Sequence, residues 1–222
     1  MGNHFNPYSL LARLPLFQGM SLSEFDNVIA HVKLGFSKVE RGGTVVAEGE
    51  VCNGLSFVLQ GELDVETVAD DGGYRIVECV ATPCVLQPER LFGLTQRYSR
   101  KFIAATECNL LTIDKAEIMK IVTASEVFRL NLMNILCTLT QRMQHLPWRR
   151  RPEGIRKKIA FFLSSRCLHP AGKKTLVVGM VRLAREIGES RLNVSKALHE
   201  LERQGLLEMG REKIVVAALE KL

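Results

Sequence analysis

The amino-acid sequence predicts an α+β protein in which a small antiparallel barrel or jelly roll is followed by a long helix and a C-terminal winged helix-turn-helix. Three observations predict this fold class. Short strand-like segments recur at even spacing between residues 36 and 113. An apolar seam with helical period follows over residues 126–145, and a helix-turn-helix spacing appears near the C-terminus.

Composition excludes several classes of protein. The chain has 222 residues, of which 46% are hydrophobic and 24% are charged, which is ordinary for a globular protein. No apolar run reaches the roughly 18–20 residues that span a bilayer, and the N-terminus has no signal-peptide pattern. We therefore expect a cytoplasmic protein with no membrane partner. Its six cysteines lack zinc spacing and are expected to be reduced, mostly as buried apolar groups.

The predicted roll is a series of short β-branched or apolar runs separated by turn residues. Glycine and aspartate punctuate it, as at Gly42-Gly43 and Asp70–Gly73, and the runs include residues 55–59, 63–68, 74–77 and 109–113. Ahead of it, Ser21 and Glu24 have the spacing of a capping box, which predicts a helix over residues 21–32.

A long helix is predicted after the roll. Asp114 is a plausible N-cap for a short helix to about Val122, and Ser125 for a longer one over 126–145. Along the long helix, apolar positions recur at alternating steps of four and three residues, which is typical of a coiled-coil seam, and Met143 widens this seam. The residues predicted to pair across a dimer are Phe128, Leu132, Ile135, Leu139 and Met143. Two readings stay open: a symmetric homodimer helix, which the regularity favours, or a helix packed on its own barrel.

The C-terminal third is basic and begins at a break. Residues 147–154 contain two prolines, a glycine and a basic run, which predicts a hinge, and a helix resumes over 155–167. Residues 147–222 carry 17 Lys and Arg against 8 Asp and Glu, a net charge of +9, whereas residues 1–146 carry −3. This asymmetry is typical of a nucleic-acid-binding module.

The strongest motif lies between residues 180 and 204. Ala184 lets two helices cross closely, Gly188 can adopt the positive φ of the turn, and Ser190 can cap the second helix, where Val194 faces the core. A hairpin over residues 206–216, with a turn at 209–213, predicts the wing, and residues 174–178 can add a third strand. The candidate DNA-binding residues are Ser190, Arg191, Leu192, Asn193, Ser195, Lys196, His199 and Lys213.

With these motifs, the chain from about residue 16 to 216 resembles the CRP/FNR superfamily of bacterial transcription regulators. Residues 48–63 look like the first half of that superfamily's cyclic-nucleotide-binding roll, residues 105–113 like its closing strand, and residues 188–207 like its recognition helix and wing. The resemblance implies a β-roll (double-stranded jelly roll) sensor domain over 1–124, a dimerisation helix over 125–146 and a winged helix-turn-helix over 147–222. It also implies RNA polymerase as a partner, through the loop 169–174.

The sensor departs from relatives that bind cyclic AMP. Those relatives carry Gly-Glu, then a loop and Arg-Ser/Thr-Ala, whereas Leu94 follows Gly93 here and Tyr98-Ser99-Arg100 replaces the second motif. The ribose partner is lost, which argues against cyclic AMP, although Arg97, Arg100 and Lys101 leave a basic cluster for another anion. The candidate effector-pocket residues are Gly93, Arg97, Tyr98, Ser99, Arg100 and Met143.

The effector is therefore not identified by the sequence. The chain lacks the N-terminal cysteine cluster of iron–sulfur sensors, and His31, His145, Met143 and the cysteines form no diagnostic haem pattern, so haem stays an alternative. A constitutively active regulator and a true cyclic-nucleotide-binding regulator also stay open. No catalytic motif is found, so an enzyme is not expected.

The predicted reading residues also depart from the superfamily. Leu192 stands where relatives often place Glu, and Ser195-Lys196 lie near their second base-reading position. Replacing an acceptor by a methyl-seeking side chain changes the preferred base. We therefore predict a palindromic operator that differs from the two best-known consensus sites of the superfamily.

Overall fold

A computed structural model of the chain describes residues 10–150 and 152–222. These residues divide into two compact units. The first contains the chain up to Leu63 together with Ala81–Ser99 and Ile103–His145. The second contains Leu146–Leu222 and two earlier segments, Asp64–Val80 and Arg100–Phe102.

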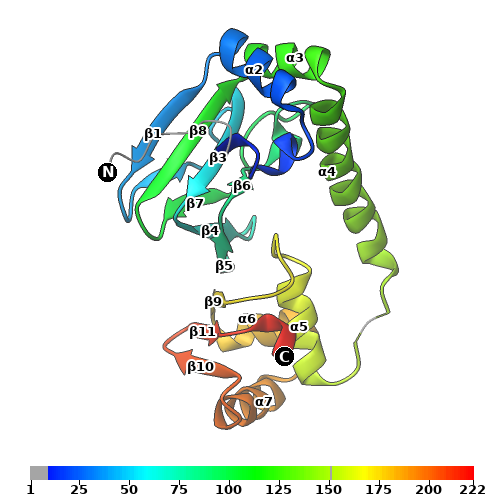
Figure 1. Ribbon diagram of the computed structural model, residues 1–222. Helices are drawn as coiled ribbons and strands as arrows, with labels where there is room; N and C mark the ends of the chain where they lie inside the picture. Colours follow the sequence, from blue (N-terminus) through cyan, green and yellow to red (C-terminus); the bar gives the residue numbers. More distant parts are fainter. Residues whose placement is uncertain (1–9, 151) are drawn as a thin grey trace. The chain divides into compact units, whose positions relative to one another are not determined.

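The first unit is built on an antiparallel sheet in the order β1-β8-β3-β6 (Figure 1). The strands are β1 (Gly35–Val39), β3 (Gly54–Gln60), β6 (Cys84–Val85) and β8 (Cys108–Asp114), and β2 (Thr44–Val46) belongs to the same unit. The central strand β8 pairs with β1 through Gly35 opposite Thr112, and with β3 through Leu55 opposite Ile113. Strands β4 (Glu62–Val68) and β7 (Lys101–Ala104) each cross the division between the units.

The helices of the first unit begin at the predicted caps. They are α2 (Leu22–His31), α3 (Lys115–Ala124) and α4 (Glu126–His145), with 3₁₀ turns η1 (Pro15–Phe17) and η2 (Pro88–Arg90). Ser21 and Glu24 form the capping box of α2, as predicted. The Ser125 hydroxyl accepts from Phe128 N at 3.2 Å and donates to Glu24 Oε1 at 2.7 Å, so one side chain caps α4 and ties it to α2.

The core of the first unit corrects the predicted dimer seam. Phe128 is fully buried, its ring centroid lies 5.0 Å from that of Phe17, and Phe17 in turn meets Phe57 at 5.8 Å. Leu132 is 5% exposed within a single chain. These two seam residues therefore belong to the chain's own core, where aromatic burial stabilises the roll, and are not available to a partner.

The second unit combines a three-helix arrangement with a hairpin wing (Figure 1). Its elements are η3 (Leu146–Trp148), α5 (Ile155–Ser164), β9 (Lys174–Val178), α6 (Met180–Ile187), α7 (Arg191–Arg203), β10 (Leu207–Gly210), β11 (Lys213–Val216) and η4 (Leu219–Lys221). The strands run in the order β10-β11-β9, and β5 (Tyr74–Ala81) continues the sheet beside β9.

Two details of the predicted second unit need correction. The turn of the wing is only Arg211-Glu212, because Gly210 pairs directly with Lys213 and Glu212 takes a left-handed φ of 53°. Helix α5 ends at Ser164, short of the predicted Cys167. Over the described residues, none of the helices combines the length and apolar character needed to cross a membrane.

Candidate nucleic-acid interface and effector pocket

The turn between α6 and α7 has the geometry that a helix-turn-helix requires. Gly188 adopts φ 65° and ψ 46°, the left-handed conformation predicted for it, which costs a glycine little. Its neighbour Glu189 donates its backbone N–H to the carbonyl of Ala184 at 2.9 Å, which closes the end of α6. The Ser190 hydroxyl accepts from Asn193 N at 3.2 Å and so starts α7.

Helix α7 separates a buried face from an exposed one. Val194 and Leu198 are fully buried and Leu201 is 3% exposed, so this face holds the helix on α5 and α6. The opposite face carries the predicted reading residues: Arg191, Leu192, Asn193, Lys196 and His199 are exposed, and Ser195 is half-buried. The structure thus brings these predicted residues together on one solvent-facing surface.

The exposed face combines three kinds of base-reading chemistry. Arg191 and Lys196 can donate to guanine edges, Asn193 can pair with adenine, and Leu192, 63% exposed, can contact a thymine methyl group. The first turn of α7 also presents the positive end of the helix dipole, which favours phosphate.

The charges beside the turn are arranged in pairs. Glu189 is the acid next to the first turn of α7, and Lys158 Nζ lies 2.5 Å from its carboxylate, which offsets its repulsion of an anion. His199 lies 3.5 Å from Glu202, an attraction that operates when the imidazole is protonated.

The wing adds a second basic position. Lys213, predicted as a DNA-binding residue, starts β11 and is exposed. Arg211 is also exposed and lies in the two-residue turn itself. Arg211 was not among the DNA-binding residues predicted from the sequence, although a basic residue next to Gly210 in the predicted wing turn could have indicated it.

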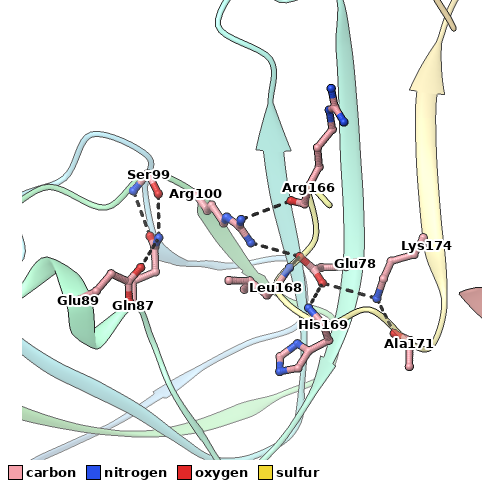
Figure 2. Close-up of polar contacts among 10 residues, drawn as sticks. All are labelled: Glu78, Gln87, Glu89, Ser99, Arg100, Arg166, Leu168, His169, Ala171 and Lys174. Atoms are coloured by element: carbon pink, nitrogen blue, oxygen red, sulfur yellow. Dashed lines mark hydrogen bonds and ion pairs between the residues drawn. The ribbon is translucent and has the colours of Figure 1, made fainter. Parts of the chain in front are cut away.

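The candidate effector-pocket residues of the roll are engaged with neighbouring protein groups. Gln87, a residue missed from the sequence, accepts from Ser99 N at 3.0 Å and donates to Ser99 Oγ at 2.8 Å (Figure 2). Arg97 Nη1 donates to the carbonyl of Gly49 at 2.8 Å. Tyr98 is 4% exposed, and burial raises the pKa of its hydroxyl well above the usual range.

The other predicted pocket residues differ in their exposure and contacts. Arg100 Nη1 donates to Glu78 Oε1 at 3.3 Å, so its charge serves an ion pair (Figure 2). Met143 lies near the end of α4 and is 66% exposed. Gly93 adopts φ 92°, which suits a turn, and Leu94 after it is fully exposed. That these residues line one pocket stays a prediction.

Comparison with known proteins agrees with the architecture. Residues 36–125 match the family model described as the cyclic nucleotide-binding domain. The catabolite activator protein of Thermus thermophilus shares 18% identity at a TM-score of 0.50, covering 91% of this chain and 93% of that one. A protein assigned to the CRP/FNR family of transcriptional regulators from Eubacterium rectale shares 17% identity at 0.51, covering 93% and 95%. The chain has the CRP/FNR fold.

Two further similarities cover smaller shares of the chain. The sensor domain of the transcriptional regulator DNR from Pseudomonas aeruginosa shares 15% identity at a TM-score of 0.52, covering 67% of this chain and 96% of that domain. A protein from Rhodopseudomonas palustris that is named as a potassium channel is 32% identical over 71 residues, 31% of this chain and 16% of that protein. The predicted CRP/FNR resemblance and α+β fold class are confirmed.

The roll of this chain lacks an acidic side chain at the position after Gly93 and has its nearby polar groups already bonded. The position after Gly93 offers the side chain of Leu94 in place of an acid that could hold a ribose. The amide of Gln87 already satisfies both the N–H and the hydroxyl of Ser99. A phosphate would have to displace these bonds, and Arg97 and Arg100 would have to leave Gly49 and Glu78.

The haem alternative is not tested by clusters of ligands, because haem iron needs only one or two axial side chains. Within residues 10–150 and 152–222, no three or more His, Cys, Asp or Glu side chains gather as a metal site would require. His31 Nδ1 lies 3.0 Å from the carbonyl of Asn27 in its own helix. Among the cysteines, Cys52, Cys108 and Cys167 are buried and Cys137 is exposed.

Proposed function

We propose that this chain is a dimeric, sequence-specific DNA-binding transcription regulator. The observation that carries the proposal is the exposed first turn of α7, where Arg191, Leu192, Asn193 and Lys196 face solvent from a helix anchored by Val194. A rigid helix with a polar, basic outer face suits the major groove of duplex DNA. Lys213 and Arg211 of the wing would contact phosphates beside it.

A second copy of the chain is the proposed partner of α4. Helix α4 exposes Leu130 by 45% and Met133 by 49%, and the exposed Cys137 follows at the next helical spacing, so the three share one face of the helix. Ile135 and Leu139, from the predicted seam, are half-buried and share a different face with Met143, which is 66% exposed. The apolar face of Leu130, Met133 and Cys137 is stabilised when it pairs with its own copy across a two-fold axis, which also presents two reading helices to a palindromic operator.

The test is selection of duplex DNA from a random pool by the full-length protein, followed by affinity measurements on the selected site. Arg191→Ala and Lys196→Ala should each weaken binding by about 1–3 kcal/mol, or roughly 5- to 150-fold, and relax base preference at one position. The matched control is Arg203→Ala, because Arg203 is an exposed arginine at the other end of the same helix, paired with Glu200.

Equal affinities for Arg191→Ala, Lys196→Ala and the parent protein would show that α7 does not read DNA. A loss as large in Arg203→Ala would show instead that a general loss of positive charge is responsible.

The effector, if one is needed, is proposed to be other than cyclic AMP. The bonds from Gln87 to Ser99 support this view, and they also fit a regulator that is constitutively active. Calorimetry with cyclic AMP and cyclic GMP should show no binding, and a Soret band in the purified protein would turn the proposal toward haem-based gas or redox sensing. Domain boundaries near residues 125 and 147 and a contact of loop 169–174 with RNA polymerase remain part of the proposal by analogy to the fold.

A further inference from the structure

Strand β5 belongs to the same compact unit as the helix-turn-helix. It pairs antiparallel with β9 over five residue pairs, from Tyr74 opposite Val178 to Glu78 opposite Lys174. Residues 64–80, called here the 64–80 hairpin, therefore extend the sheet of the wing. The pairing satisfies backbone groups of β9 that would otherwise form an open sheet edge.

The 64–80 hairpin also completes the hydrophobic core beneath the reading helix. Ile76 is 2% exposed and belongs to the same cluster of buried side chains as Val194 and Leu198 of α7. Tyr74 packs edge-on against Phe162 of α5 with ring centroids 5.1 Å apart. Removing β5 would expose this side of the core to water.

A buried carboxylate holds the hairpin in place. Glu78 is 1% exposed, and Figure 2 shows donors converging on it from several segments. Oε1 accepts from Leu168 N at 2.7 Å and from Arg100, while Oε2 accepts from His169 N at 3.1 Å. Lys174 Nζ, on a fully buried side chain, lies 3.5 Å from Oε2.

The charge on Glu78 is needed because of this burial. An ammonium as deeply buried as that of Lys174 is costly without a counter-charge, and its other bond, to the carbonyl of Ala171 at 2.7 Å, supplies only a neutral acceptor. A glutamine at this position keeps only one acceptor oxygen, so one of the backbone N–H groups of residues 168 and 169 would also lose its partner.

The tip of the hairpin reaches the helix that precedes the reading helix. Asp71 Oδ2 lies 2.6 Å from Arg182 Nη1, and Arg182 Nη2 lies 2.7 Å from Glu186 one turn further along α6. The hairpin thus contacts α6 through the Asp71–Arg182 ion pair and α5 through Tyr74, and its Ile76 belongs to the same buried cluster as the core residues of α7.

We propose that the 64–80 hairpin is a coupling element that holds the reading helix in its DNA-binding position, with Glu78 as the positioning residue that keeps β5 on β9. Any event that frees β5 would loosen α7. The inference rests on the proposed DNA-binding function, but its structural part can be measured without DNA.

Glu78→Gln in the full-length protein tests the coupling. Gln keeps the shape of the side chain but removes the charge that faces Arg100 and Lys174. Amide hydrogen exchange should rise at least tenfold in β5 and β9 and also in the first turn of α7. Affinity for the selected DNA site should fall by a similar factor, on the order of tenfold.

Two further variants separate coupling from general damage. Glu78→Gln combined with Lys174→Met leaves no buried ammonium without a counter-charge, although Arg100 still lacks its partner. Protection of β9 and DNA affinity should therefore both recover in part relative to Glu78→Gln alone. Glu66→Gln is the matched control, because Glu66 lies on β4 of the same hairpin and pairs with Arg75 at 3.5 Å. It should leave exchange in β9 and α7 unchanged.

Increased exchange in β5 and β9 with unchanged exchange in α7 and unchanged DNA affinity would overturn the coupling and leave the proposed function intact. Failure of the parent protein to bind any DNA would overturn the proposed function, and exchange in α7 would then decide the coupling alone. If Glu78→Gln does not fold, the double variant decides: recovered protection of β9 without recovered protection of α7 would contradict the inference.

Discussion

Leu192 is the single residue that most distinguishes the proposed reading surface. It is 63% exposed on the first turn of α7, between Arg191 and Asn193. An exposed leucine in a polar surface is tolerated where it gains a contact, and a thymine methyl group offers one. We therefore propose that this side chain sets base preference through an apolar contact.

Leu192→Glu should change the selected half-site. A carboxylate accepts from the amino group of cytosine or adenine, so selection should return such a base at the affected position, and affinity for the parent operator should fall by about 1–3 kcal/mol. The control is Val181→Glu, which adds the same charge at a 59% exposed position on α6. It should weaken binding to all sequences alike, and an unchanged preference in Leu192→Glu would contradict the assignment.

Ser125 caps the start of α4 and hydrogen-bonds to Glu24 in the first turn of α2. Its contribution to the stability of the chain should therefore depend on pH. The pKa of Glu24 is lowered, first by the backbone N–H of Ser21 and then by the Ser125 hydroxyl. Because the pKa of Glu24 in the folded chain is lower than its ordinary value of 4.5, ionised Glu24 stabilises the fold above pH 4.5. This stability is lost as the pH falls through the lowered pKa of the folded chain.

Ser125→Ala should therefore destabilise the chain by about 1–2 kcal/mol at pH 7, from the lost cap of α4 and the lost bond to Glu24. Urea unfolding at pH 7 and at successively lower pH should show that the loss shrinks once the pH has fallen through the lowered pKa of Glu24. Ser37→Ala, an exposed serine on β1, serves as the control. A loss that does not change with pH would mean that the Glu24 bond contributes little.

At the scale of the element, α4 has two faces with different surroundings. One face buries Phe128 and Leu132 in the roll, and another exposes Leu130, Met133 and Cys137. The first face therefore packs on the chain's own roll, and the homodimer stays a proposal. That proposed homodimer depends only on the exposed face.

Met133→Glu should weaken the dimer. A charge introduced into an apolar helix pair must be desolvated, so the monomer–dimer equilibrium measured by analytical ultracentrifugation should shift toward monomer by at least tenfold. Met119→Glu is the matched control, since Met119 on α3 is 45% exposed, close to the 49% of Met133. An unchanged equilibrium in Met133→Glu would remove this face from the proposed interface.

At the scale of the whole molecule, two reading surfaces should act on one operator. Each neutralised phosphate contributes about −0.9 to the slope of log affinity against log salt concentration. A dimer that makes roughly 6–10 such contacts should therefore show a slope between about −5 and −9. The Met133→Glu protein, measured as a monomer on a half-site, should show about half that slope, and equal slopes would contradict paired binding.

The sequence by itself determined the features that depend on neighbouring residues. The capping box of Ser21, the Ser125 cap, the left-handed Gly188 and the buried spacing of Val194 follow from propensities and periods that act within one or two turns. These local rules were enough to predict the helix-turn-helix and its exposed residues.

Only the tertiary structure decided the pairing of β5 with β9, the burial of Phe128 and the bonds from Gln87 to Ser99. The physical reason is separation along the chain. Glu78 accepts a hydrogen bond from Leu168, which lies 90 positions away in the sequence. The periodicity of neighbouring residues does not predict which distant segment will supply donors to a buried carboxylate. The roll strands were predicted as a series, but their partners are set by the packing of the whole chain.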